Sequence, residues 1–198
     1  MPPSGGIKVF SGFALGLQEV RQATGREPAT GEKRNYANYG SWLGAVGYMA
    51  LLDQIGSCFK PKVTPLVAGN TIEKALTYFS NLSSDERCAL YALRCAFAHD
   101  YSLYNINPRN PRYTHQFAVK VGPGPVITLP TQSWDGDYSH KTTENQTVVN
   151  LEAFGDLVED ICLKIFDLAN RKELTVVLPG GSDELVQRYA YWQRVAPQ

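Results

Sequence analysis

The sequence predicts a mainly α fold: an up-and-down helical bundle of about four to five helices with a small β-hairpin insertion. Apolar residues recur at helical spacing in several segments, as they do in helices that bury one face. Two strand-like runs surround a Gly-Pro-Gly-Pro turn at 122–125, which indicates the hairpin. The chain has 198 residues, of which 43% are apolar, so it is long enough for one domain with a buried core.

The N-terminal part of the chain is expected to precede the domain. Residues 1–37 are rich in glycine, proline, serine and charged residues, so we expect an irregular arm that includes a short helix or strand. The first long helix is expected over residues 39–59, because one stripe follows helical spacing: Trp42, Val46, Met49 and Asp53. Glycines at positions 40, 44 and 47 indicate close helix packing, within the chain or at a dimer interface.

The helical domain is expected to span residues 38–198. Two prolines in the stretch KPKVTP end the first helix, because proline cannot continue it. A short helix follows over residues 71–79. The next helix has the best-marked start in the sequence, since Ser83 and Glu86 fit a capping box and acidic residues occupy the first turn.

The second half of the domain holds the hairpin and the last two helices. We expect the hairpin at about 114–130, followed by a polar stretch over residues 131–147. A long amphipathic helix is predicted over residues 151–171, with Asn150 as its candidate cap. A final helix is predicted over residues 182–195.

Composition excludes several classes of protein. The formal net charge is zero and the pI is near 6.8, whereas proteins that coat long nucleic acids are usually basic. The N-terminus lacks the basic start of a signal peptide, and no apolar run is long enough for a bilayer. No cysteine lies at zinc-ligand spacing, so we expect a cytoplasmic protein with no metal, no cofactor and four reduced thiols: Cys58, Cys88, Cys95 and Cys162.

The residues with the clearest chemical potential are Arg94 and His99, which form an R-x-x-x-x-H motif at the end of the helix that Ser83 caps. Histidine exchanges a proton near neutral pH, and arginine offers a planar, permanently charged fork to phosphate oxygens. Together they are sufficient for RNA cleavage without a metal: the ribose 2′-OH attacks phosphorus, His99 moves a proton and Arg94 stabilises the phosphoryl oxygens. DNA, which lacks the 2′-OH, would not react.

Helix geometry adds a condition to this hypothesis. A five-residue step on an α-helix rotates by roughly 500°, which leaves the two side chains roughly 140° apart. Arg94 and His99 therefore cannot converge on a regular helix, and we expect His99 to lie where the helix ends and the chain turns. A second copy of the pair across a homodimer would complete a symmetric cleft.

At these residues the sequence resembles the HEPN superfamily, whose helical domains carry R-x(4–6)-H near the end of one helix. The resemblance implies a homodimeric, metal-independent endoribonuclease of a defence or toxin–antitoxin system, with Arg94 and His99 as the catalytic pair. In one branch the tyrosine of R-x-x-x-x-H-x-Y, here Tyr101, is modified by an antitoxin nucleotidyltransferase. The residue after the arginine is often polar in active members, whereas here it is Cys95.

Alternatives remain open for these residues. The rival function is a non-catalytic HEPN-like module that binds nucleotides or partner proteins, which Cys95 and the neutral net charge favour. In a third interpretation the protein is an unrelated helical one and the motif is accidental. Tyr101 is either a packing aromatic or a modified residue, and Asp100 either orients His99 or caps the chain locally.

A local positive patch is a candidate RNA-binding surface. The span from Tyr101 to Trp134 contains no acidic residue, although the whole chain is neutral. Such a patch would guide single-stranded RNA by charge and by stacking on nearby tyrosines, although a merely solvated loop and hairpin would have the same composition. Its candidate residues are Arg109, Arg112, His115 and Lys120.

Overall fold

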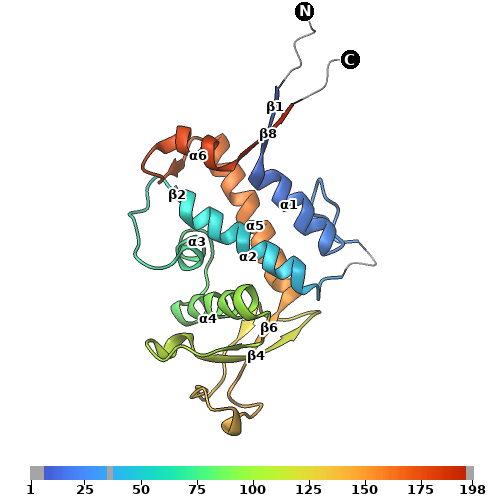
Figure 1. Ribbon diagram of the computed structural model, residues 1–198, viewed down its shortest axis with the longest axis vertical. Coiled ribbons are helices and arrows are strands. Elements are labelled where there is room, and N and C mark those ends of the chain that lie inside the picture. The colour runs from blue at the N-terminus through green and yellow to red at the C-terminus, as the bar shows by residue number, and fades with distance from the viewer. Residues whose placement is uncertain (1–6, 35–37, 195–198) are drawn as a thin grey trace, which may run out of the picture.

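The computed structural model of the chain describes residues 7–34 and 38–194. Within these ranges it contains six α-helices and three β-sheets, with the helices in the middle of an elongated molecule and the largest sheet at one end (Figure 1). The prediction of a mainly α bundle with one hairpin is therefore wrong, because the fold is mixed α/β. Its strand pairings join segments that are far apart in the sequence, and local patterns do not reveal such pairs.

The helical part is built around one buried helix. This helix, α2, packs against α1, α3 and α5, and its apolar residues point in all directions, as expected of a helix enclosed by others. The six helices are α1 (Gly12–Ala23), α2 (Trp42–Cys58), α3 (Thr71–Phe79), α4 (Ser84–Cys95), α5 (Leu151–Asn170) and α6 (Gly181–Tyr189). Short 3-10 helices occupy Pro111–Tyr113 and Tyr138–His140.

The predicted helix starts are confirmed at both caps. The Ser83 side chain accepts a hydrogen bond from the Glu86 amide, and the Glu86 carboxylate accepts one from the Ser83 amide. Asn150 caps α5 by accepting a hydrogen bond from the amide of Ala153. These caps fix where α4 and α5 begin, and α4 carries Arg94 in its last turn.

The N-terminal segment contributes to the core. Residues 1–37 were expected to be an irregular arm, but the described part of them contains β1 (Ile7–Ser11) and the whole of α1. The helices α1 and α2 approach closely at Gly47, where a β-carbon would lie 2.4 Å from Cγ2 of Val20. The glycine spacing of α2 therefore serves helix packing within the chain.

A buried ion pair ties three of these helices together. Arg21 of α1 donates two hydrogen bonds to Glu159 of α5, at 2.7 and 3.0 Å, and both side chains are less than 10% exposed. The Tyr48 hydroxyl of α2 donates to the same carboxylate at 2.8 Å. Burial, followed by the charge of Glu159, raises the pKa of Tyr48, so this hydroxyl stays protonated.

The largest sheet has a mixed topology that the sequence did not suggest. Its strand order is β3 (Tyr104–Asn105), β4 (His115–Lys120), β6 (Gln146–Asn150) and β5 (Ile127–Thr128). Strand β6 lies between the two strands of the expected hairpin and is parallel to β4 and antiparallel to β5. The hairpin at 114–130 is therefore wrong. Strand β6 begins at Gln146, in the last two residues of the stretch read as polar, and it leads without a break into α5.

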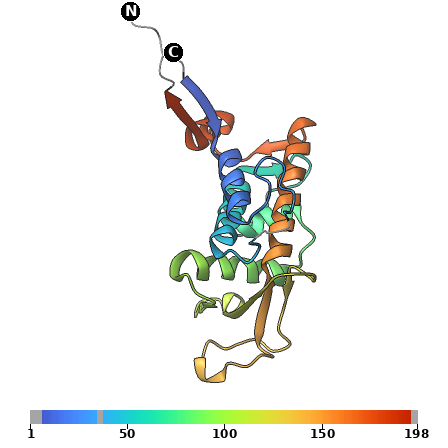
Figure 2. The same cartoon turned by 90° about the vertical axis from the view of Figure 1, so that its right-hand side faces the viewer.

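This sheet packs on α4, so that α4 lies between the other helices and the sheet, as Figures 1 and 2 both show. Its inward residues Phe117, Ile127 and Val149 join the same hydrophobic core as the helices. A long connection over residues 129–145 extends from the sheet at the end of the molecule opposite the termini (Figure 2). The sheet therefore positions its loops on the α4 side of the molecule.

Two short strand pairs complete the structure. Strand β2 (Phe59–Pro61) pairs with β7 (Leu174–Val176), and β1 pairs with β8 (Ala190–Arg194); both pairs are antiparallel. The helix predicted over 182–195 ends at Tyr189, because the chain then becomes extended and pairs with β1. Among the described residues, none of the helices has the length and apolar character that crossing a bilayer requires.

Candidate functional site

The helix α4 does not end in a regular turn but in one π-helical turn. This π-turn covers Ala96–Asp100, and the amide of Tyr101 donates its hydrogen bond to the carbonyl of Ala96, five residues earlier. Tyr101 itself has a left-handed backbone conformation, with φ of 49°, which ends the helix. A π-turn is rare and occurs often at functional sites.

The π-turn brings Arg94 and His99 together. Hydrogen bonding from residue i to i+5 places residues five apart on one side, whereas an α-helix would separate them by roughly 140°. As a result, Nη1 of Arg94 lies 3.4 Å from Nε2 of His99. Convergence was expected from the end of the helix, and the structure achieves it with a wider turn. The His99 side chain is exposed, and that of Arg94 is 30% exposed.

Arg94 is held from behind by Asp53 of α2. Its Nε donates to Oδ2 of Asp53 at 2.8 Å, and the hydroxyl of Thr71 donates to Oδ1 of the same carboxylate. Burial lowers the pKa of Arg94, but the negative charge of Asp53 and its hydrogen bond, with smaller contributions from Cys95 and Tyr91, together raise that pKa above its ordinary value. Arg94 is therefore fully charged, and its Nη1 lies beside His99.

The surroundings of the pair are apolar on the inner side and open on the outer side. A pocket of about 70 Å³ lies against Arg94, lined also by Val46, Met49, Ala50, Asp53 and Ala98. Trp42, in the first turn of α2, stacks on Phe97 with ring centroids 4.6 Å apart and contacts Tyr101 at 5.2 Å. Trp42 therefore packs against both the π-turn and the residue that ends it.

The other two residues of the motif are placed at its surface. Tyr101 is 58% exposed although it contacts Trp42, so its hydroxyl is accessible. Asp100 is exposed, and its carboxylate makes no hydrogen bond or ion pair with residues 7–34 or 38–194. Asp100 therefore does not orient His99 in this structure.

Among the predicted RNA-binding residues, Arg112 lies at the opposite end of α4 from Arg94. Arg112 donates to Asp85 in the first turn of α4 at 2.9 Å, and Asp85 precedes Arg94 by nine residues, about 13 Å along the helix. Arg109 is exposed in the preceding loop, and Lys120 is exposed at the end of β4. Arg112 is thus held at the first turn of α4, whereas Arg94 lies in its last turn.

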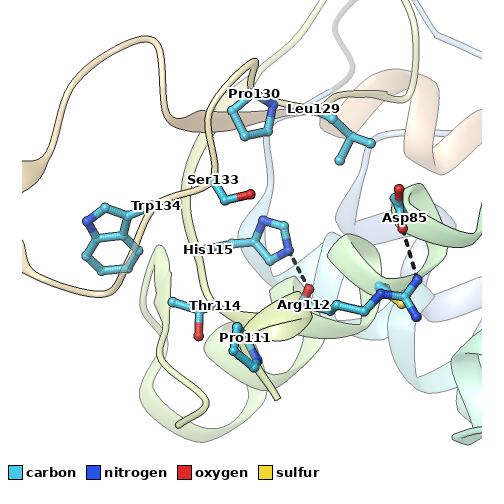
Figure 3. A pocket seen from close by; sticks show the side chains of 10 residues that line it. Asp85, Pro111, Arg112, Thr114, His115, Leu129, Pro130, Ser133 and Trp134 are labelled. Carbon is cyan, nitrogen blue, oxygen red and sulfur yellow. Dashed lines mark hydrogen bonds and ion pairs between the residues drawn. The ribbon is translucent and has the colours of Figure 1, made fainter. Parts of the chain in front are cut away.

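His115 has a structural environment. Its Nδ1 lies 2.9 Å from the Thr147 hydroxyl and its Nε2 lies 3.0 Å from the Arg112 carbonyl, as Figure 3 shows for the second contact. Burial lowers the pKa of His115, so the neutral form is favoured. We therefore assign His115 to the packing of β4 against β6. It lines a pocket of about 260 Å³ together with Arg112, Asp85 and Trp134.

Asp53 is the residue that sequence reasoning did not connect to the site. The sequence places it on a stripe of an otherwise uncharged helix, and a single carboxylate on such a helix requires a partner. That signal indicates a nearby cation, but it does not identify Arg94, which lies 41 residues later. Only the packing of α4 beside α2 and α3 makes the pair.

Comparisons with protein-family models, with curated proteins and with solved structures found no match to this chain. Within residues 7–34 and 38–194, no three histidine, cysteine, aspartate or glutamate side chains gather in a way that could hold a metal ion. The function must therefore be inferred from the chemistry of Arg94, His99 and Asp53.

Proposed function

We propose that the protein is a metal-independent endoribonuclease of the HEPN type that cleaves single-stranded RNA by attack of the 2′-OH. The observation that carries the proposal is the contact of 3.4 Å between Arg94 and His99 across the π-turn. A proton carrier and a fixed cation lie side by side at an open surface, as phosphoryl transfer from RNA requires. A catalytic pair that depends on an uncommon backbone turn is unlike the surroundings of an ordinary surface arginine.

The reaction follows from the positions of the two groups. His99 accepts the proton of the 2′-OH, and the 2′ oxygen forms a bond to phosphorus while the bond to the 5′ oxygen breaks. Arg94 donates hydrogen bonds to the non-bridging oxygens, whose negative charge increases in the transition state. The leaving 5′ oxygen takes a proton from water or from His99 of a second copy. The products are a 2′,3′-cyclic phosphate and a 5′-hydroxyl.

Asp53 is a positioning residue in this scheme. Its carboxylate binds Nε of Arg94 and leaves the Nη1 edge for the phosphate. A cation that is already oriented loses less entropy when substrate binds, and it stabilises the transition state without rearrangement. We further propose a homodimer in which two such pairs face one cleft, and a cytoplasmic location, which four free cysteines support.

The experiment that tests the function compares RNA cleavage by the wild-type protein with that of His99→Ala and Arg94→Lys. Lysine keeps the charge beside Asp53 but lacks the planar fork, so both variants are expected to lose at least 10²-fold in rate. Arg171→Ala, which removes an exposed ion pair of α5, is the matched control and should cleave normally. Wild-type rates in both site variants would contradict the proposal.

A second candidate function is a non-catalytic module that binds nucleotides. The ion pair between Arg94 and Asp53 favours it, because the carboxylate neutralises the guanidinium and occupies one of its donors. In this case the wild-type protein would bind a nucleotide through Arg94 without cleaving RNA. Equilibrium binding of labelled RNA beside the cleavage assay separates the two functions, since only the nuclease turns its substrate over.

A further inference from the structure

A second polar pocket lies at the edge of the mixed sheet, outside the site of Arg94 and His99. It has a volume of about 280 Å³ and is formed by the edge strand β3, the first part of β4 and the chain that leads into β6. The lining residues are Tyr104, Gln116, Lys141, Thr142, Thr143 and Gln146. An aromatic ring, a cation and two amides are the groups that recognise an unstacked nucleobase.

Gln116 provides a fixed hydrogen-bond acceptor in this pocket. The residue is 97% buried, since its exposed fraction is 3%, and its Nε2 donates to the Thr142 carbonyl at 2.9 Å and to Oδ1 of Asn145. Because both partners are acceptors, Nε2 must point to them, and Oε1 points the other way. Within the described residues, no donor reaches Oε1. Oε1 is not enclosed, since the buried side-chain nitrogen or oxygen that lacks a partner in the described part of the chain is Nε of Arg26; Oε1 is therefore open to the pocket, where a ligand donor can replace water.

The orientation of Asn145 is fixed in the same way. Its Oδ1 accepts a hydrogen bond from the amide of Thr142 at 3.0 Å, and its Nδ2 donates to the carbonyl of His140 at 2.9 Å. Asn145 therefore cannot turn its amide to offer Gln116 a donor. The wall of the pocket is built before any ligand binds.

Tyr104 supplies an aromatic surface beside this acceptor. Its ring lies in a cluster with Trp134 and Tyr138, at centroid distances of 5.8 and 5.2 Å. The ammonium of Lys141 lies 4.9 Å from the centre of the Tyr104 ring and 3.2 Å from its hydroxyl. Lys141 is exposed, so its long side chain can turn from the ring to a phosphate when a base stacks there.

We propose that this pocket binds one base of single-stranded RNA, stacked on Tyr104, with an exocyclic amine donating to Oε1 of Gln116 and Lys141 contacting the phosphate. The inference rests on the proposed function, because its ligand is the RNA that Arg94 and His99 would cleave. Tyr104 follows His99 by five residues and lies at most about 17 Å away along the chain. One strand could therefore occupy both sites. Adenine, cytosine and guanine carry exocyclic amines, whereas uracil can donate only through its ring N3–H and stacks more weakly, so the pocket would favour the bases with an amine over uracil at this position.

Binding of labelled hexanucleotides of A, C and U to the inactive variant His99→Ala tests the proposal. We expect oligo(A) and oligo(C) to bind more tightly than oligo(U). Tyr104→Ala should weaken the binding of oligo(A) at least about tenfold, the loss of one base stack, whereas Tyr104→Phe should retain it. Lys141→Met, at an exposed position, should also weaken binding and reduce its salt dependence. Lys62→Met, which changes an exposed lysine directly after β2, should not.

The outcomes separate this proposal from the proposed function. If Tyr104→Ala and Lys141→Met bind all three hexanucleotides as the parent does, the base pocket is wrong even where the wild-type protein cleaves RNA. If binding depends on both residues but RNA is never cleaved, the pocket stands and the nuclease proposal fails. AMP that binds as tightly as oligo(A) would also contradict the proposal, because the ligand would then be a free nucleotide.

Discussion

The ion pair with Asp53 has two opposite consequences for Arg94. Asp53 anchors its Nε at 2.8 Å, which restricts the guanidinium, while Nη1 remains directed at His99. Because the guanidinium is already restricted, it loses less conformational entropy when substrate binds. The carboxylate of Asp53 also places a negative charge near the bound phosphate. Within the proposed nuclease, the benefit of orientation must exceed this repulsion.

The first prediction concerns Asp53→Asn. The amide has nearly the same shape but attracts the guanidinium less, so Arg94 is expected to lose its fixed orientation and the rate of RNA cleavage to fall about 10²-fold. A positioning role predicts that kcat falls more than KM rises. Asp160→Asn, an exposed aspartate of α5, is the matched control. A cleavage rate unchanged by Asp53→Asn would show that Asp53 has no part in catalysis.

The second prediction concerns His115 and the pH dependence of stability. Burial lowers the pKa of His115 below its ordinary value of about 6.5, so the unfolded chain binds this proton more readily than the folded protein does. Its contribution to the free energy of unfolding is therefore complete above about pH 6.5 and decreases as the pH falls through the folded pKa. Urea unfolding of His115→Gln at several pH values is expected to show a smaller decrease in this range.

His140 gives a built-in contrast to His115, because a hydrogen bond of 2.7 Å from its ring to Asp135 raises the pKa of His140. Its contribution has the opposite sign: it is present below about pH 6.5 and disappears as the pH rises. A wild-type protein whose stability below pH 6.5 falls no more steeply than that of His115→Gln would contradict the assignment of His115 as a half-buried, neutral residue.

The elements whose ends are marked by local chemistry were predictable. Helices α3, α4 and α5 begin where a polar cap precedes an apolar stripe, and each of these signals lies within a few residues. The π-turn after α4 was not predictable, since CAFAHD has no residue that excludes a regular helix. Packing selects the wider turn, through the stack of Phe97 on Trp42, which is 55 residues away.

The third prediction compares the two caps. Ser83→Ala removes an exposed cap and is expected to lower the free energy of unfolding by about 1 kcal/mol. Asn150→Ala is expected to cost more, about 2–3 kcal/mol, because Asn150 is fully buried and also donates to the Gly122 carbonyl at 2.7 Å. Equilibrium urea unfolding measures both, and an equal cost would contradict the second role of Asn150.

The sheet shows why strand partners were misjudged. The Gly-Pro-Gly-Pro turn suggested that β4 and β5 pair with each other, which is the shortest connection. In the structure β6 lies between them, and its residues Thr147 and Val149 are completely buried. The alternation in QTVVN is too short to indicate a strand, and its parallel partner lies 30 residues earlier.

At the scale of the whole molecule, the buried ion pair of Arg21 and Glu159 joins the N-terminal segment and α5 into one unit. Sequence reasoning excluded residues 1–37 from the domain, since their composition is that of a flexible arm. Their helix is nevertheless enclosed, because Phe13, Leu17 and Val20 join the core and Arg21 finds a buried carboxylate on a distant helix. Neither contact has a local signal.

The fourth prediction tests this unit. Glu159→Gln leaves the Arg21 guanidinium buried without a counter-charge and is expected to lower the free energy of unfolding by about 3 kcal/mol. The double variant with Arg21→Met should recover part of that loss, because it removes the unpaired buried cation while the amide still accepts a hydrogen bond from Tyr48. Lys33→Met, which breaks partly exposed pairs with Glu152 and Asp156, should cost less, about 1 kcal/mol. Additive costs for the two buried changes would contradict the coupling.

The central claim is that Arg94 and His99 cleave RNA by attack of the 2′-OH. The most direct measurement is the analysis of RNA ends after incubation with the purified protein in EDTA, beside the same RNA with one 2′-deoxy nucleotide at the cleaved position. We expect fragments with 2′,3′-cyclic phosphate and 5′-hydroxyl ends, and no cleavage at the deoxy nucleotide. Intact RNA, 5′-phosphate ends, or cleavage that continues at the deoxy position would contradict the claim.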